Sequence, residues 1–302
     1  ICIDFGAAEK YNGKCNLSNR EMNVDCFSSS DQKLVEKSLE RFSVEETIAF
    51  FESLGLYIKE KNGYLYPLAE QAAVVLDVLR YTVESLGIKV LYESEIRKIY
   101  RVNDANGRTG ICVENAKEKA YYHSVVIACG SKAAPKTGSD GSGYELVQAM
   151  GHTIHPVLPA LVQLKCNDSF CKALAGIRCD AKVHIYAGEE LLCEERGELQ
   201  LTDYGISGIP VFQLSGLVNR RMYEMSQSLK KKQGKEETVC AVIDFLPEVS
   251  GKELKALLAK RCETVIYEQG TVEEFFTGLL NKKLMLQFVK MAGLKGDEKV
   301  SC

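Results

Sequence analysis

Residues 124–164, SVVIACGSKAAPKTGSDGSGYELVQAMGHTIHPVLPALVQL, contain the pattern on which the fold prediction depends. The β-branched run Val125–Ile127 predicts a short buried strand that ends at Cys129-Gly130. A loop rich in glycine, serine and proline follows, and Ser142 with Glu145 forms the S-x-x-E pattern of a capping box at a helix start. A strand end, a glycine-rich loop and a helix N-terminus can together seat a phosphate-bearing ligand. The pattern is equally consistent with a tight strand-to-helix connection that binds nothing.

Composition limits the classes of protein that fit this chain. A length of 302 residues predicts roughly two domains, and 46% hydrophobic residues are enough for a proper core. The net charge of -3 argues against a nucleic-acid partner, because binding to phosphates needs clustered Lys and Arg. No apolar run approaches the ~20 residues that span a bilayer, and residues 1–12 lack the layout of a secretory signal. We therefore expect a cytoplasmic protein without a membrane partner.

The 12 cysteines are scattered and form no CxxC pair. Cys166, Cys171 and Cys179 fit no common zinc spacing, and His152 with His155 lacks a nearby carboxylate or cysteine. We predict no metal site and reduced thiols.

The first half of the chain alternates helical and strand patterns. A helix is predicted around Leu34–Phe42, and a second helix begins at the Ser43/Glu46 capping box. Leu56–Pro67 alternates around Asn62-Gly63, which is a strong hairpin signal. A helix from Ala72 to Leu86 stops at Gly87.

Strand patterns then dominate as far as the opening stretch. Ile88–Tyr92 is predicted as a strand, and Ile96–Val102 pairs with Arg108–Glu114 across Asn106-Gly107. Tyr121–Ala128 is predicted to return as a buried strand. Nucleotide-binding α/β enzymes often have this order of elements.

The pattern changes at Pro156. Strand-like runs separated by turns predict a small antiparallel sheet or barrel, and they cover Ala160–Lys165, Lys182–Tyr186, Gln200–Thr202 and Val239–Phe245. Residues 202–216, TDYGISGIPVFQLSG, form either a loop that approaches a ligand or a corner where backbones pass closely. The last fifty residues are helical, with capping boxes at Ser250/Glu253 and Thr271/Glu274. Apolar stripes on these helices are predicted to face a core, and they comprise Leu254, Leu257, Leu258 and Cys262, then Phe275 and Leu279, then Leu284, Phe288 and Met291.

Several of these stretches, in the same order, resemble the aminoacetone-oxidase-like group of bacterial NAD(P)/FAD-dependent oxidoreductases. The resembling stretches are GKCNLSN (13–19), residues 56–87, VVIACGSKAAPKTGSDGSGYELVQAMGH (125–152), PALVQLKC (159–166), GELQLTDYGISG (197–208) and FFTGLLNKKLM (275–285).

The resemblance implies a fold of class α/β plus α+β. It consists of a partial FAD/NAD(P)-binding Rossmann-like domain with a β-meander (1–155), an inserted β-barrel-like substrate domain (156–248) and a helical cap (249–302). It also implies FAD contacts at Gly13, Lys14, Cys15, Asn16 and Asn19, at Ile96, at Ala128, Cys129 and Gly130, and at Gly138, Asp140, Gly141 and Gly143. NAD(P)H is the implied electron donor, and a small molecule is the implied substrate.

The sequence also departs from that family. A GxGxxG turn opens the family's flavin domain, but Gly6 is the lone glycine before Gly13. The chain also stops before the family's last glycine segment, so we expect it to be the middle portion of a family protein.

Three functional hypotheses follow. The first is an FAD-dependent oxidoreductase that transfers hydride, with Tyr204, Gly205 and Ser207 as substrate contacts suggested by their position and no catalytic residue assigned. The second is a non-catalytic fragment that does not retain cofactor. The third is a nicotinamide-dependent dehydrogenase without flavin, against which the missing glycine turn also counts.

Overall fold

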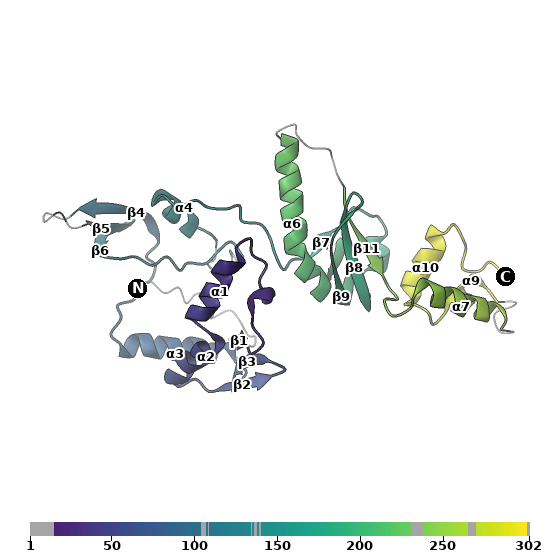
Figure 1. The fold of residues 1–302 in the computed structure, drawn as a ribbon, viewed down its shortest axis with the longest axis horizontal. Coiled ribbons are helices and arrows are strands. Elements are labelled where there is room, and N and C mark those ends of the chain that lie inside the picture. The colour runs from purple at the N-terminus through teal and green to yellow at the C-terminus, as the bar shows by residue number, and fades with distance from the viewer. Residues whose placement is uncertain are drawn as a thin grey trace. The chain divides into compact units, whose positions relative to one another are not determined.

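The structure is a computed structural model that describes residues 15–103, 107, 109–133, 135, 138, 140–230, 238–264 and 270–300. The chain divides into two compact units, residues 1–155 and residues 156–302 (Figure 1). Residues 1–14, Asn106 and Arg108 of the predicted hairpin, and residues 231–237 lie outside the described residues.

Unit 1 contains two small antiparallel sheets, each with helices beside it. One sheet has the order β1-β3-β2 and the other β4-β5-β6. The elements are β1 (Ser18–Asn19), a 3-10 helix (Val24–Cys26), α1 (Gln32–Arg41), α2 (Val44–Ser53), β2 (Ile58–Lys61), β3 (Tyr64–Pro67), α3 (Ala72–Ser85), β4 (Ile96–Asn103), β5 (Thr109–Asn115), β6 (Lys119–Tyr122) and α4 (Gly143–Ala149).

Most local predictions for unit 1 are confirmed. The Ser43/Glu46 capping box is present at α2. The β2–β3 hairpin turns at Asn62 and Gly63, whose φ values of 52° and 79° are those that a tight hairpin turn requires. Gly87, at φ 64°, follows the end of α3.

Two predicted strands in unit 1 are wrong. Residues 88–92 form no strand, and Ile88 and Val90 instead pack against Leu76 and Val83 of α3. The strand predicted over Tyr121–Ala128 ends at Tyr122, and Val126 is 89% exposed. A strand needs a neighbour for its backbone groups, and within the described residues this run has none. Among the described residues both sheets of unit 1 are antiparallel, so the parallel pairing typical of α/β domains is not present there.

Unit 2 is built around a sheet of order β11-β8-β9-β10-β7, in which every pair is antiparallel. Its elements are β7 (Leu164–Lys165), α5 (Cys171–Leu174), β8 (Arg178–Ala187), β9 (Glu190–Thr202), β10 (Gly205–Gly208), α6 (Ile209–Lys230), β11 (Val239–Asp244), α7 (Gly251–Cys262), α9 (Val272–Phe276) and α10 (Lys282–Met291). The predicted strand-like runs fall within or overlap β7, β8, β9 and β11.

One face of this sheet forms the main core. Alternate residues of β8, such as Val183 and Ile185, are fully buried together with Leu199 of β9. The long helix α6 packs on β9, and its Val211, Leu214 and Val218 join the same cluster. Leu284 of α10 belongs to it too, so the last helix of the chain contributes to the core of the sheet. Burial of one such side chain contributes about 1.5–3 kcal/mol.

Sequence analysis missed α6 and misplaced part of the helical C-terminus. The capping boxes at Ser250/Glu253 and Thr271/Glu274 are confirmed. However, α7 has no buried residue, so its leucines do not face a core as predicted. In α10 the buried residues are Leu284, Met285 and Val289, whereas Phe288 and Met291 of the predicted stripe are exposed.

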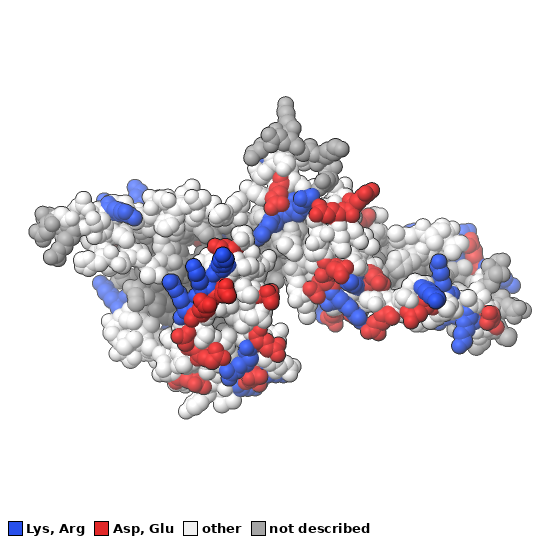
Figure 2. All heavy atoms as spheres, viewed as in Figure 1, with Lys and Arg blue, Asp and Glu red and all other residues white. Residues whose placement is uncertain are grey.

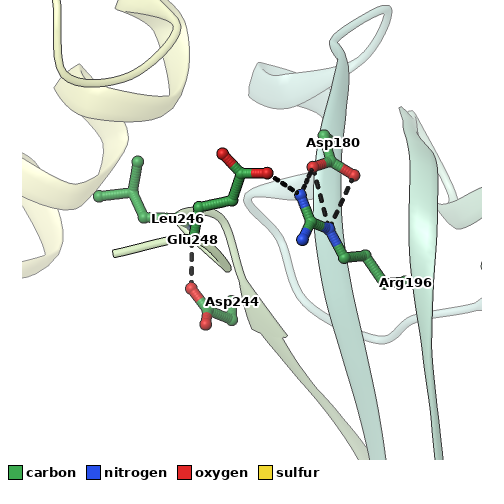
Figure 3. A network of polar contacts seen from close by, with 5 residues as sticks. All are labelled: Asp180, Arg196, Asp244, Leu246 and Glu248. Carbon is green, nitrogen blue, oxygen red and sulfur yellow. Dashed lines mark hydrogen bonds and ion pairs between the residues drawn. The ribbon is translucent and has the colours of Figure 1, made fainter. Parts of the chain in front are cut away.

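The opposite face of the β8–β9 ribbon carries ion pairs between diagonal neighbours. Arg178 pairs with Glu198 at 2.9 Å, and Lys182 pairs with Glu194 at 2.6 Å. Between them, Arg196 binds Asp180 through two nitrogens and also reaches Glu248 beyond β11, at 2.8 Å (Figure 3). Diagonal cross-strand neighbours are within reach of such long side chains. Arg196 thus joins the ribbon to the segment after β11.

Replacing Arg196 with methionine is expected to reduce the loss of unfolding free energy that the protein shows as the pH falls below about 5. Arg196 holds the pKa of Asp180 below its ordinary value of 3.8, chiefly by hydrogen bonding. The stabilisation is therefore fully present above pH 3.8 and is lost as the pH falls through the lower folded-state pKa. Urea unfolding between about pH 2 and pH 5 measures the slope. Arg178→Met is the matched control, because it removes a neighbouring arginine–carboxylate pair, Arg178–Glu198, from the same face of the sheet. An identical change in slope for both variants would contradict the assignment.

Candidate cofactor-binding site

The segment Ala128–Gly130, among the predicted cofactor contacts, is accessible to solvent. All three residues are exposed, and Gly130 has a φ of 74°. Residues 124–130 form no regular element, so the segment presents backbone groups to solvent. Binding of FAD by this segment stays a prediction.

The glycines at the start of α4 are packed against side chains of the same loop. A Cβ on Gly143 would lie 2.5 Å from the Cys129 sulfur, and a Cβ on Gly141 would lie 2.5 Å from Cγ of Lys132. The Tyr144 hydroxyl donates to Ser131 Oγ at 2.6 Å, which holds the two ends of the loop together. The space beside Gly141 and Gly143 is therefore filled by the chain itself.

Asp140, and not Ser142, is the side chain that accepts a backbone hydrogen bond just before α4. The Ser142 side chain makes no cap hydrogen bond, so the predicted Ser142/Glu145 box is wrong. The Ser142 N–H donates to the Asp140 carboxylate at 2.9 Å, because the loop turns back through Gly141 at φ 84°. Hydrogen bonds from Ser142 lower the pKa of Asp140. A carboxylate at this position repels a phosphate and accepts hydroxyl groups. The loop is consequently better suited to a ligand hydroxyl than to the predicted phosphate.

The first predicted loop lies on a different sheet. Gly13 and Lys14 lie outside the described residues, whereas Asn19 pairs with Tyr64 in the β1–β3 ladder. Asn16 is exposed, and Cys15 is half-buried. Burial raises the pKa of the Cys15 thiol, so it is protonated at neutral pH.

Ile96 begins β4, and α4 packs beside this strand. The Asn115 side chain donates to Ser94 Oγ at 2.8 Å and thereby fixes the chain just before Ile96. The structure therefore brings α4, which begins at Gly143, against the strand that begins at Ile96, while Asn19 lies in the β1-β3-β2 sheet.

The predicted substrate residues lie in unit 2 at a close approach of backbones. A Cβ on Gly205 would lie 2.2 Å from the Leu164 carbonyl oxygen, and one on Gly208 would lie 2.3 Å from that of Glu198. Ser207 is buried in β10, and Tyr204 is 38% exposed. Strand packing thus accounts for both glycines, in agreement with the second of the two interpretations of this stretch.

Cysteine chemistry adds no further candidate among the described residues. Burial, with a hydrogen bond to Asp168, raises the pKa of Cys166 to about 11, so it is a poor nucleophile. No group of three or more metal-binding side chains occurs in the described part of the chain. Nine described cysteines are free, while Cys262 is in a disulfide, contrary to the prediction that the thiols are reduced.

Sequence analysis missed a polar face on the β2–β3 hairpin. Lys59 and Lys61 lie opposite Tyr66 and Tyr64 in the ladder, and the four side chains line a depression of about 140 Å³. The alternating pattern Lys-x-Lys and Tyr-x-Tyr on either side of Asn62-Gly63 is the signal that could have identified it.

Comparison with known proteins gives consistent matches along nearly the whole chain. The family model described as HI0933-like protein Rossmann domain matches residues 10–289. A 3-dehydro-bile acid delta(4,6)-reductase of Clostridium scindens is 38% identical over 285 residues, which cover 94% of this chain and 65% of that protein. A ribosomal RNA dihydrouridine synthase of Haemophilus influenzae is 25% identical over 271 residues, which cover 87% of this chain and 65% of that protein. The chain thus spans about two thirds of the length of these relatives.

Proposed function

The chain belongs to the HI0933-like protein family, and from this membership we propose that it is part of an FAD-dependent reductase that acts on a ring double bond conjugated to a carbonyl group. The 38% identity with the bile acid reductase over 285 residues carries the proposal. The aminoacetone-oxidase-like group is the finer assignment that we propose within the family.

The names of the two relatives describe related chemistry. A 3-dehydro Δ4,6 bile acid has two carbon–carbon double bonds in conjugation with its ring ketone, and uridine has a ring double bond next to a carbonyl. In either case one carbon–carbon double bond is reduced. A hydride adds to the carbon of that bond that is farther from the carbonyl group, and a proton adds to the other carbon of the bond. Bound FAD would supply that hydride after it has taken one from NAD(P)H.

The residues of this chain would bind and orient the reactants. We propose that unit 1 holds the flavin, with main-chain groups of the exposed Ala128–Gly130 segment as contacts and the Asp140 carboxylate as acceptor for a hydroxyl group. Residues 156–248 would hold the substrate. Residues 249–302 would form the helical portion of the same unit, since Leu284 packs in its core.

A small-molecule substrate is favoured over RNA by the charge of the chain. The net charge is -3, and Figure 2 shows basic and acidic side chains interspersed over the described residues of the face in view. An RNA-binding surface needs a cluster of basic residues.

No helix among the described residues is long and apolar enough to cross a membrane. A cytoplasmic location remains a proposal, supported by the nine free thiols.

The assay that tests the proposed function uses the protein loaded with FAD, NADPH as reductant and anaerobic buffer. A 3-oxo-Δ4,6 bile acid is the first substrate, and its reduction is followed by loss of the dienone ultraviolet absorbance and by mass. We expect a mass gain of two hydrogens that depends on protein and FAD, and no dihydrouridine in ribosomal RNA treated in parallel. Reduction of the RNA alone would contradict the substrate class. FAD loading without reduction of either compound would contradict the reaction.

A further inference from the structure

The solvent-facing side of the β2–β3 hairpin combines cations and aromatic rings. In the ladder Lys59 lies opposite Tyr66, and Lys61 lies opposite Tyr64, so all four side chains project from one face. Leu65, on the other face, is buried. The tight turn at Asn62-Gly63 fixes this register and therefore the spacing of the four side chains.

The two lysines have different electrostatic environments. Lys59 forms an ion pair with Glu70, whose backbone has a left-handed φ of 54° just after β3. Lys61 has no carboxylate within ion-pair distance among the described residues. The depression of about 140 Å³ thus has a neutralised pair, Lys59–Glu70, and one available ammonium group in its wall.

The two tyrosines supply a ring surface. Their ring centroids are 6.5 Å apart with planes tilted by 40°, and Tyr64 is 46% exposed although it lies in a strand. Aromatic faces in such a position contact flat or rigid ring systems, and a nearby ammonium selects ligands with negative charge. The hairpin also contacts the predicted cofactor loop (13–19), since the Leu17 N–H donates to the Leu65 carbonyl at 2.8 Å.

We propose that this hairpin face is a binding site for a ring-bearing organic anion, with Lys61 paired to the anionic group and Tyr64 and Tyr66 against the ring. The anionic group is the phosphate of a nucleotide or the carboxylate of a ring-bearing acid, and the titrations described next separate these two sources. The site does not depend on flavin binding, so its test is independent of the proposed function.

Fluorescence of a single indole can report on this site. The chain has no tryptophan, so Tyr64→Trp introduces a unique reporter at an exposed ring position. The Tyr64→Trp protein is titrated with AMP and with a 3-oxo bile acid. Adenosine and the bile acid methyl ester are the uncharged counterparts. Lys61→Gln is added in the reporter background, and Lys117→Gln, at an exposed position next to β6, is the matched control.

We expect saturable quenching by AMP or by the bile acid, which identifies the anion. Lys61→Gln should weaken that binding roughly two- to fivefold, as expected for one partly screened ion pair. Lys117→Gln should leave the binding unchanged, and the uncharged counterpart should not respond to Lys61→Gln. The proposal is overturned if neither anion quenches at millimolar concentration, or if Lys61→Gln weakens binding no more than Lys117→Gln. Near-ultraviolet circular dichroism confirms that each variant is folded.

Discussion

Replacing Gly208 with alanine is expected to destabilise unit 2 by on the order of 3 kcal/mol or more. The backbone φ at this position is 104°, a conformation that side-chain-bearing residues rarely adopt. The added Cβ would also lie 2.3 Å from the Glu198 carbonyl oxygen and 3.2 Å from the Gln200 nitrogen. These atoms belong to the central strand β9, which is paired on both sides and cannot move away without loss of its ladder.

Gly216→Ala provides the matched control for this experiment. Gly216 lies inside α6, and its added Cβ would meet only the Ala160 Cβ, at an ordinary contact distance of 3.5 Å. Alanine is a better helix former than glycine, so this variant should gain about 0.5–1 kcal/mol. Urea unfolding followed by circular dichroism gives both values. Equal stability of the two variants would show that β10 does not pack against β9 as described.

The sequence was most informative where local chemistry determines local structure. The capping boxes at Ser43, Ser250 and Thr271 are all formed, because a side-chain oxygen and a glutamate three residues later satisfy each other's backbone groups. The hairpin at Asn62-Gly63 was predicted for the same reason, since few residues adopt two successive left-handed conformations.

Prediction failed where the outcome depends on distant neighbours. Val125–Ile127 has the composition of a buried strand, but within the described residues no strand pairs with it. The Ser142/Glu145 pattern matches the capping-box motif as well as the other three do. However, the chain turns at Gly141, and the Ser142 N–H donates to the Asp140 carboxylate. Helix α6 was not predicted, because residues 202–216 were interpreted as a loop or a corner. Pro210 near the start of the helix and the spacing of Val211, Leu214 and Val218 indicated it.

The candidate site could be predicted only in part for a similar reason. A glycine in a motif is required either by a ligand or by the chain's own packing, and the sequence does not distinguish these causes. Gly143 and Gly205 are explained by contacts with Cys129 and with the Leu164 backbone, respectively. Gly130 is exposed at a left-handed φ, so it remains the position where binding of a ligand is best tested.

Gly130→Val is expected to weaken FAD binding at least about tenfold, which corresponds to about 1.4 kcal/mol. A branched side chain at Gly130 would separate the exposed backbone from the flavin and strain the left-handed turn. Gly107→Val is the control, because Gly107 has the same φ of 74° and lies between β4 and β5 with nothing near its added Cβ. Gly130→Val and Gly107→Val should therefore lose similar amounts of stability. A lower FAD affinity in Gly130→Val alone would then be due to its position in the binding segment.

The central claim is that this chain binds FAD at the segment following Ile127. The direct measurement is a titration of the purified protein with FAD, followed by the flavin absorbance bands and by quenching of flavin fluorescence. The account predicts saturation at one FAD per chain, with binding retained in Gly107→Val and weakened in Gly130→Val. A folded protein that binds no FAD would contradict it and would support the alternative that these residues do not retain the cofactor.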